Sequence, residues 1–149
     1  MKNLLLIIVS SLVFSGVAFS ADLPKEAVAD TENLCREEHT NRGKLDQSLY
    51  KFCIQKHRDG YANLKKLSKK YGKEPWFEEA LQFSIDKWTE RGLRSDAGVG
   101  YQMRKICEGH EDIKYMSKQP NWDQAKFDDC KERFGIKLDT VIFCYKKGY

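Results

Sequence analysis

The stretch LDQSLY (residues 45–50) guides the fold prediction, because its pattern returns as WDQAKF (122–127) and LDTVIF (138–143). Each copy has a large apolar residue, then Asp, and an aromatic residue four positions after the Asp. An Asp at the N-cap accepts a hydrogen bond from a free backbone N–H of the first helical turn. The apolar residue before it and the aromatic residue after it then pack together as a hydrophobic staple. The pattern predicts three helix starts, at Asp46, Asp123 and Asp139, and each cap is expected to contribute about 1 kcal/mol.

A second short pattern repeats as FCIQK (residues 52–56), FSIDK (83–87) and FCYKK (143–147). In the helices that the caps predict, these pentapeptides fall within a helix, with the Phe and the Cys or Ser directed towards neighbouring helices and the Lys directed outward. We therefore interpret the repeat as one structural unit built three times, and not as a binding or catalytic site used three times.

Apolar residues at spacings of three or four indicate further helices. One runs from about Thr31 to Gly43, one follows Pro75 as far as Gly92, and one is capped by Ser95 or Asp96. No segment shows the alternating pattern of a strand. The sequence predicts an all-α, single-domain bundle of about six short helices in hairpins, stabilised by disulfides.

The first twenty residues, MKNLLLIIVSSLVFSGVAFS, have the form of a cleavable signal peptide. Lys2 precedes an apolar run, and small residues precede the expected cut near Ser20/Ala21. The apolar run is short for a stable membrane span, and no later stretch is apolar over eighteen residues. We expect residues 21–149 to form one exported helical domain, periplasmic or secreted, with no transmembrane segment after cleavage.

The charge pattern argues against a nucleic-acid partner. The chain has 26 basic and 22 acidic residues, a net charge of +4, and the two signs are interspersed. Nucleic-acid binding would favour a basic patch or stripe. The expected partner is an unknown envelope or extracellular component, either a protein or an anionic molecule.

Five cysteines in an exported chain of this length predict disulfides. In an antiparallel helical hairpin, residues equidistant from the turn lie opposite each other, and Cys35 and Cys53 are centred on residue 44. Cys130 has two partners that meet this test, Cys107 and Cys144. We prefer Cys107–Cys130 because it mirrors Cys35–Cys53. That choice leaves Cys144 as a candidate free thiol, which its apolar neighbours are expected to bury; the alternative is an exposed thiol through which two chains join.

Cys–His pairs offer an alternative to the bridges. Cys35 with His39, Cys53 with His57, and Cys107 with His110 have spacings suited to a structural zinc. In the predicted hairpin, however, His39 and His57 lie on opposite sides of the cysteine pair and diverge from it. We therefore expect bridges, with no metal and no cofactor.

Four lysines, Lys65, Lys66, Lys69 and Lys70, lie on one side of the helix that follows Asp46 and form a candidate anion-binding face. Lysines near a helix C-terminus are also simply favourable there. No catalytic motif is evident, so the leading hypothesis is a non-catalytic binding protein. The alternatives are a small hydrolase that combines one of the histidines with distant carboxylates, and a metal-dependent module.

Overall fold

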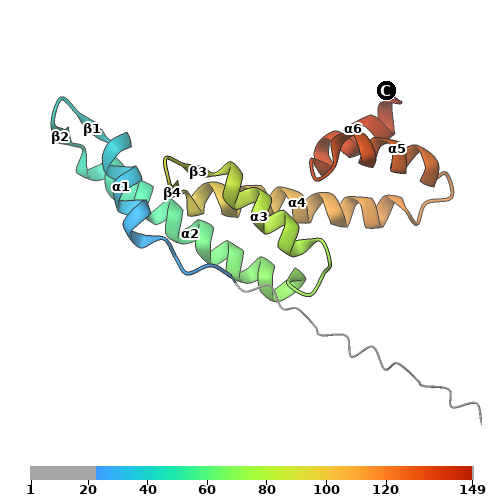
Figure 1. Cartoon of the computed structure of the whole chain (residues 1–149), viewed down its shortest axis with the longest axis horizontal. Helices are drawn as coiled ribbons and strands as arrows, with labels where there is room; N and C mark the ends of the chain where they lie inside the picture. Colours follow the sequence, from blue (N-terminus) through green and yellow to red (C-terminus); the bar gives the residue numbers. More distant parts are fainter. Residues whose placement is uncertain (1–22, 149) are drawn as a thin grey trace, which may run out of the picture.

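The computed structural model describes residues 23–148, so the predicted signal peptide and its cleavage point lie outside the described residues. Within that range the fold is all-α, as predicted (Figure 1). Its six helices are α1 (Val28–Glu38), α2 (Gln47–Tyr71), α3 (Phe77–Lys87), α4 (Asp96–Met116), α5 (Gln124–Phe134) and α6 (Leu138–Lys147).

Two small antiparallel strand pairs, absent from the sequence prediction, connect α1 to α2 and α3 to α4. The first joins β1 (Thr40–Asn41) to β2 (Lys44–Leu45), and the second joins β3 (Thr89–Glu90) to β4 (Leu93–Arg94). Strands of two residues are too short to show an alternating pattern, so sequence periodicity could not reveal them.

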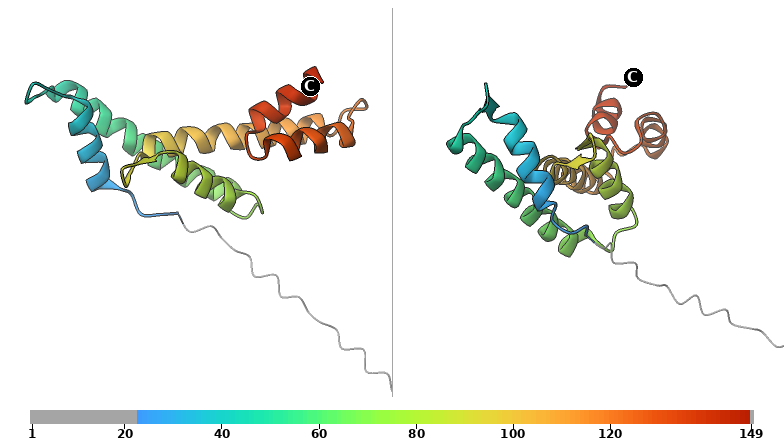
Figure 2. Two further views of the ribbon diagram at one scale, coloured as in Figure 1. Left: turned by 45° about the horizontal axis from the view of Figure 1, so that its top comes forward. Right: turned by 60° about the vertical axis from the view of Figure 1, so that its left-hand side comes forward.

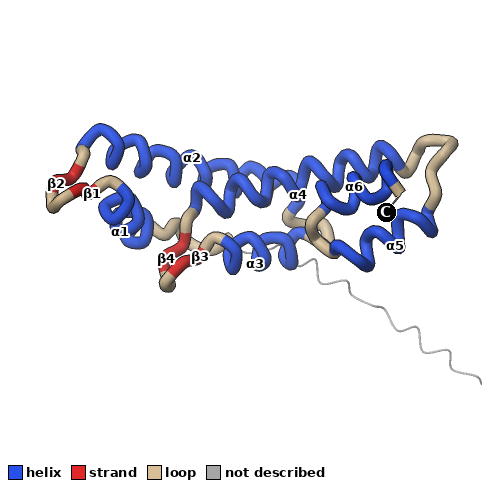
Figure 3. Tube along the Cα trace, turned by 90° about the horizontal axis from the view of Figure 1, so that it is seen from above, coloured by secondary structure: helices blue, strands red, loops and turns tan. Residues whose placement is uncertain are grey.

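The helices form an elongated molecule with α2 and α4 along its length. Helix α1 and the β1–β2 hairpin lie at one end, and α5 and α6 lie at the other (Figures 1 and 2). Seen from above, α2 and α4 continue one another while α1, α3 and α5 lie along one side (Figure 3). The molecule is therefore a row of three helical hairpins.

The first two hairpins are copies of one unit, which we call unit 1 (α1 to α2) and unit 2 (α3 to α4). Each element of unit 2 begins 49 residues after its counterpart, as Val28 and Phe77, or Gln47 and Asp96, show. The turns agree in detail, because Arg42 and Arg91 both have φ 50° and each is followed by a glycine with positive φ.

This register corrects the alignment of the pentapeptides. Ser84 of FSIDK corresponds to Cys35 in the first helix of unit 1, and not to Cys53 of FCIQK in the second. The shared feature of FCIQK and FSIDK is thus a helical pattern rather than one position in the unit.

Two of the three predicted Asp caps are confirmed. The Asp46 carboxylate accepts from the backbone N–H of Ser48 and Leu49, at 2.9 and 3.1 Å, and Asp123 accepts from Lys126 at 3.0 Å. Asp139 is not the cap, because α6 begins one residue earlier, at Leu138, and the N-cap position is Lys137.

Helices α2 and α4 approach closely where glycines replace side chains. A Cβ atom on Gly60 would lie 2.4 Å from the backbone oxygen of Asp96, and one on Gly100 would lie 2.5 Å from the backbone oxygen of Gly60. The core continues from this crossing through a cluster of buried side chains that includes Leu64, Phe77, Val99, Met103, Ile106 and Val141.

The disulfides are Cys35–Cys53, as predicted, and Cys130–Cys144. The preferred pairing of Cys107 with Cys130 is wrong, as is the assignment of Cys144 as the free thiol, since Cys107 is free and buried. The physical reason is that α5 and α6 form their own hairpin, which brings Cys130 and Cys144 to a Cα separation of 5.8 Å. Cys107 lies on α4 and packs in the core.

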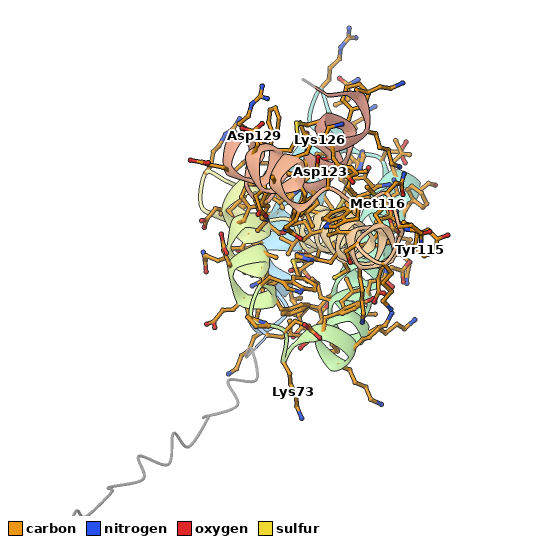
Figure 4. All side chains as sticks on the ribbon, turned by 90° about the vertical axis from the view of Figure 1, so that its right-hand side faces the viewer. Lys73, Tyr115, Met116, Asp123, Lys126 and Asp129 are labelled. Atoms are coloured by element: carbon orange, nitrogen blue, oxygen red, sulfur yellow. A yellow bond between two sulfur atoms is a disulfide. The ribbon has the colours of Figure 1, made fainter. Side chains whose placement is uncertain are left out.

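An aromatic cluster lies at the end of the molecule where the chain passes from α4 to α5. Figure 4 looks onto this end and labels Tyr115 and Met116 of α4, Asp123, which caps α5, and Lys126 of α5. Just before α5, the Trp122 ring stacks on Tyr145 at a centroid distance of 4.7 Å and contacts Phe127 at 4.9 Å. The staple predicted for residues 122–127 is therefore present and extends to α6.

Candidate functional site: a lysine-rimmed cleft

A cleft of about 370 Å³ lies between α3, α4 and the start of α6. Its apolar lining is Phe83, Ile106, Ile136 and Leu138, of which Ile106 and Leu138 are buried. Its polar lining is Lys87, Tyr101, Gln102, Lys105, Lys137, Asp139 and Thr140. A volume above 300 Å³ and a partly apolar wall are typical of small-molecule sites.

Three helical segments place the lysines of this cleft. Lys87 is the last residue of α3, Lys105 lies in the middle of α4, and Lys137 is the N-cap residue of α6. All three are exposed. Lys87 Nζ donates to Gln102 Oε1 at 2.9 Å, and Lys105 Nζ lies 3.6 Å from Glu108. The cleft therefore carries three cations and one lining carboxylate, Asp139.

This cleft was not predicted from the sequence. Its lysines come from residues 87, 105 and 137, which share no motif and meet only because α6 packs against α4. The close packing depends on Gly109, where a Cβ atom would lie 2.7 Å from the Leu138 side chain. The sequence does not reveal the contact between α4 and α6, so it could not show that these lysines lie around one cleft.

The four lysines predicted to form an anion-binding face on α2 are exposed, but Lys65 and Lys70 already contact other side chains. Lys65 Nζ lies 4.9 Å from the centre of the Tyr61 ring, and Lys70 Nζ lies 3.5 Å from Glu111, which also accepts a hydrogen bond from the Tyr71 hydroxyl. That hydrogen bond from Tyr71 lowers the pKa of Glu111, which keeps the carboxylate charged beside Lys70. None of these four lysines lines the cleft between α3, α4 and α6.

The three histidines occupy different environments. His110 stacks on Trp76 with ring centroids 3.7 Å apart, and burial lowers the pKa of His110 to about 4, with Lys131 adding a smaller effect. His57 is buried in α2, and His39 follows α1 with its Nε2 3.7 Å from Glu38. No histidine or cysteine is among the described residues that line the cleft.

The prediction that His57 diverges from the cysteine pair is wrong, whereas among the described residues His39 and His57 share no ligand group, as expected for positions on opposite sides of the pair. A nitrogen of His57 lies within 4.8 Å of both bridge sulfurs, and a nitrogen of His39 lies within the same distance of the Cys53 sulfur and of Glu38. Helix α2 places His57 one turn after Cys53 on the same face, which keeps the imidazole beside the bridge.

Comparison with protein-family models, with curated proteins and with solved structures gives no match for this chain. None of the described helices is both long enough and apolar enough to cross a bilayer.

Proposed function

We propose that the protein is an exported, non-catalytic binding protein whose cleft takes a small anion with an apolar part. Two disulfides are consistent with export to an oxidising compartment. The observation that carries the proposal is the convergence of Lys87, Lys105 and Lys137 on a cleft with an apolar wall.

The chemistry of the cleft selects such a ligand. Lysine ammonium groups donate charge-assisted hydrogen bonds to carboxylate, phosphate or sulfate oxygens. Phe83, Ile136 and the exposed Tyr101 ring offer apolar surface that such a head group alone would not cover. An anion with a short hydrocarbon tail would use both parts of the wall.

The test is calorimetric titration with octyl phosphate, with inorganic phosphate and octanol as probes that each lack one part. Octyl phosphate is expected to bind more tightly than either. The double variant Lys105→Glu/Lys137→Glu is expected to weaken octyl phosphate binding tenfold or more. Hydrogen bonds to a charged group contribute about 1.5–3 kcal/mol each, and about 1.4 kcal/mol corresponds to tenfold.

The matched control is Lys65→Glu/Lys69→Glu, which makes the same change in net charge on the α2 face outside the cleft. This control should bind octyl phosphate as the unchanged protein does. Equal losses in the two double variants would overturn the cleft as the site and indicate a general charge effect, and stronger loss in the control would favour the lysine face.

A further inference from the structure

The surroundings of the Cys35–Cys53 bridge contain more ligating groups than a structural disulfide needs. The sulfurs and a nitrogen of His57 lie within 4.8 Å of one another, and all three residues are buried. On the solvent side, the Glu38 carboxylate lies 3.9 Å from the Cys53 sulfur. The two sulfurs and His57 thus form one ligand group between α1 and α2, and Glu38 belongs to a neighbouring group that shares Cys53.

His57 has an unused ligand atom. Its Nδ1 is buried and has no hydrogen-bond partner among the described residues, although the side chain is only 7% exposed. A buried polar nitrogen without a partner carries a free-energy cost of about 1–3 kcal/mol.

The second bridge provides an internal comparison. Within residues 23–148, the only ligand groups of three or more that meet the same distance limit contain Cys53, and none contains Cys130 or Cys144. The extra ligands are therefore particular to unit 1 and are not a general property of bridged hairpins in this molecule.

We propose that the Cys35–Cys53 bridge is reducible and that the reduced pair, together with His57, binds a zinc ion, with Glu38 as the fourth ligand. A dithiol donor supplies two electrons and two protons, its own sulfurs become a disulfide, and Cys35 and Cys53 become thiols. Zinc then replaces the two thiol protons, which pass to solvent, and His57 adds its nitrogen lone pair. Zinc itself is neither oxidised nor reduced.

The geometry suits this exchange. Tetrahedral zinc with Zn–S distances near 2.3 Å needs its two sulfurs ~3.8 Å apart. The Cα atoms of Cys35 and Cys53 are 5.7 Å apart, so rotation of the two side chains can open the sulfurs without moving the helices. Glu38 is 62% exposed and lies at the entrance, where it can meet an incoming cation.

The test uses the purified protein, reduced without oxygen by a phosphine and titrated with Zn²⁺ against a chromogenic chelator. Co²⁺ serves as a spectroscopic probe, because thiolate ligands give it charge-transfer absorption. We expect one zinc per chain in the unchanged protein and in Cys130→Ala/Cys144→Ala, and none in Cys35→Ala/Cys53→Ala. His57→Ala is expected to weaken binding by more than the roughly 10–100-fold typical of a residue that only supports a metal ligand.

Because His57 is buried, its replacement could disturb folding. The fold of His57→Ala is therefore checked first in the oxidised form, where circular dichroism must show unchanged helicity. The exposed variant Glu38→Gln provides a second measure that does not disturb the core, and it is expected to weaken binding at least tenfold. The proposal is overturned if the reduced protein takes up no zinc, if zinc is lost with Cys130 and Cys144 instead, or if neither Glu38→Gln nor a folded His57→Ala weakens binding.

Discussion

Units 1 and 2 share a backbone but hold their helices together differently. In unit 2, α3 buries Phe77, Ala80, Leu81 and Ser84, whereas in unit 1, α1 buries only Thr31 and Cys35. Unit 1 has the disulfide and unit 2 has none. Helix α5, whose only buried residue is Cys130, is bridged as well. A disulfide is thus found in those hairpins whose first helix has too small an apolar face to be held in place by packing alone.

The close contact between the two units at Gly60 is predicted to be the position where a substitution lowers stability most. Gly60→Val places side-chain atoms against the backbone at Asp96 and Ala97, which cannot rotate away. Overpacking costs about 1–3 kcal/mol and occasionally more, and we expect the upper end here. The measurement is the urea midpoint. Ala62→Val, on the exposed side of the same helix, is the control for helix propensity and should lower stability by less than about 1 kcal/mol. Equal losses would show that the contact is not tight.

Removing either bridge is predicted to have the next largest effect. Cys35→Ala/Cys53→Ala and Cys130→Ala/Cys144→Ala should each lower the free energy of unfolding by about 3 kcal/mol, since each opens a loop of similar length. Hydrogen exchange should then rise mainly in α1 or mainly in α5. Cys107→Ala controls for the loss of a buried sulfur. If the bridged helices keep their protection without the bridges, packing alone holds them, and the comparison between units fails.

The sequence predicted the helices well because their signals are local. Asp46 and Asp123 act through hydrogen bonds to residues two or three positions away, which a sequence displays directly. The pairing of Cys130 was not local in this sense, because Cys107 and Cys144 both satisfied the hairpin test. The choice depended on α5 packing against α6 in one hairpin. The cleft depended on the same long-range contact, which no motif encodes.

Burial of His110 predicts a pH-dependent stability in unit 2. Its pKa is about 4 in the folded protein and about 6.5 in the unfolded chain, so the unfolded chain takes up the proton first as pH falls. Neutral His110 therefore contributes about 1–3 kcal/mol to the free energy of unfolding. This contribution is complete above about pH 6.5 and is lost as the pH falls from there to 4.

The check on this prediction is a set of urea midpoints from pH 7.5 to 4.5. His110→Phe keeps a ring against Trp76 and removes the titration, so its midpoints should fall less steeply. Some slope should remain, because burial also lowers the pKa of His57. An unchanged slope in His110→Phe would show that His110 does not resist protonation in the fold.

The smallest predicted effect is a gain, obtained by giving unit 2 the bridge that unit 1 has. Ser84 and Gln102 correspond to Cys35 and Cys53, each 49 residues further along an equivalent hairpin. The double variant Ser84→Cys/Gln102→Cys should therefore oxidise to a disulfide. The gain should be about 1 kcal/mol instead of the full 3 kcal/mol of chain entropy, since engineered bridges often deliver less than predicted. The variant also removes the hydrogen bond from Ser84 Oγ to Ala80 and that from Lys87 to Gln102.

Peptide mapping without reduction identifies the new bridge, and the urea midpoint with and without a reductant measures its effect. The single variant Gln102→Cys, which cannot form the bridge, is the control for the altered contact with Lys87. If the double variant stays reduced in oxidising buffer, the two hairpins differ at these positions despite their matching turns. If it oxidises but gains no stability, α3 is already held as firmly as a bridge could hold it, because its apolar face alone secures the helix.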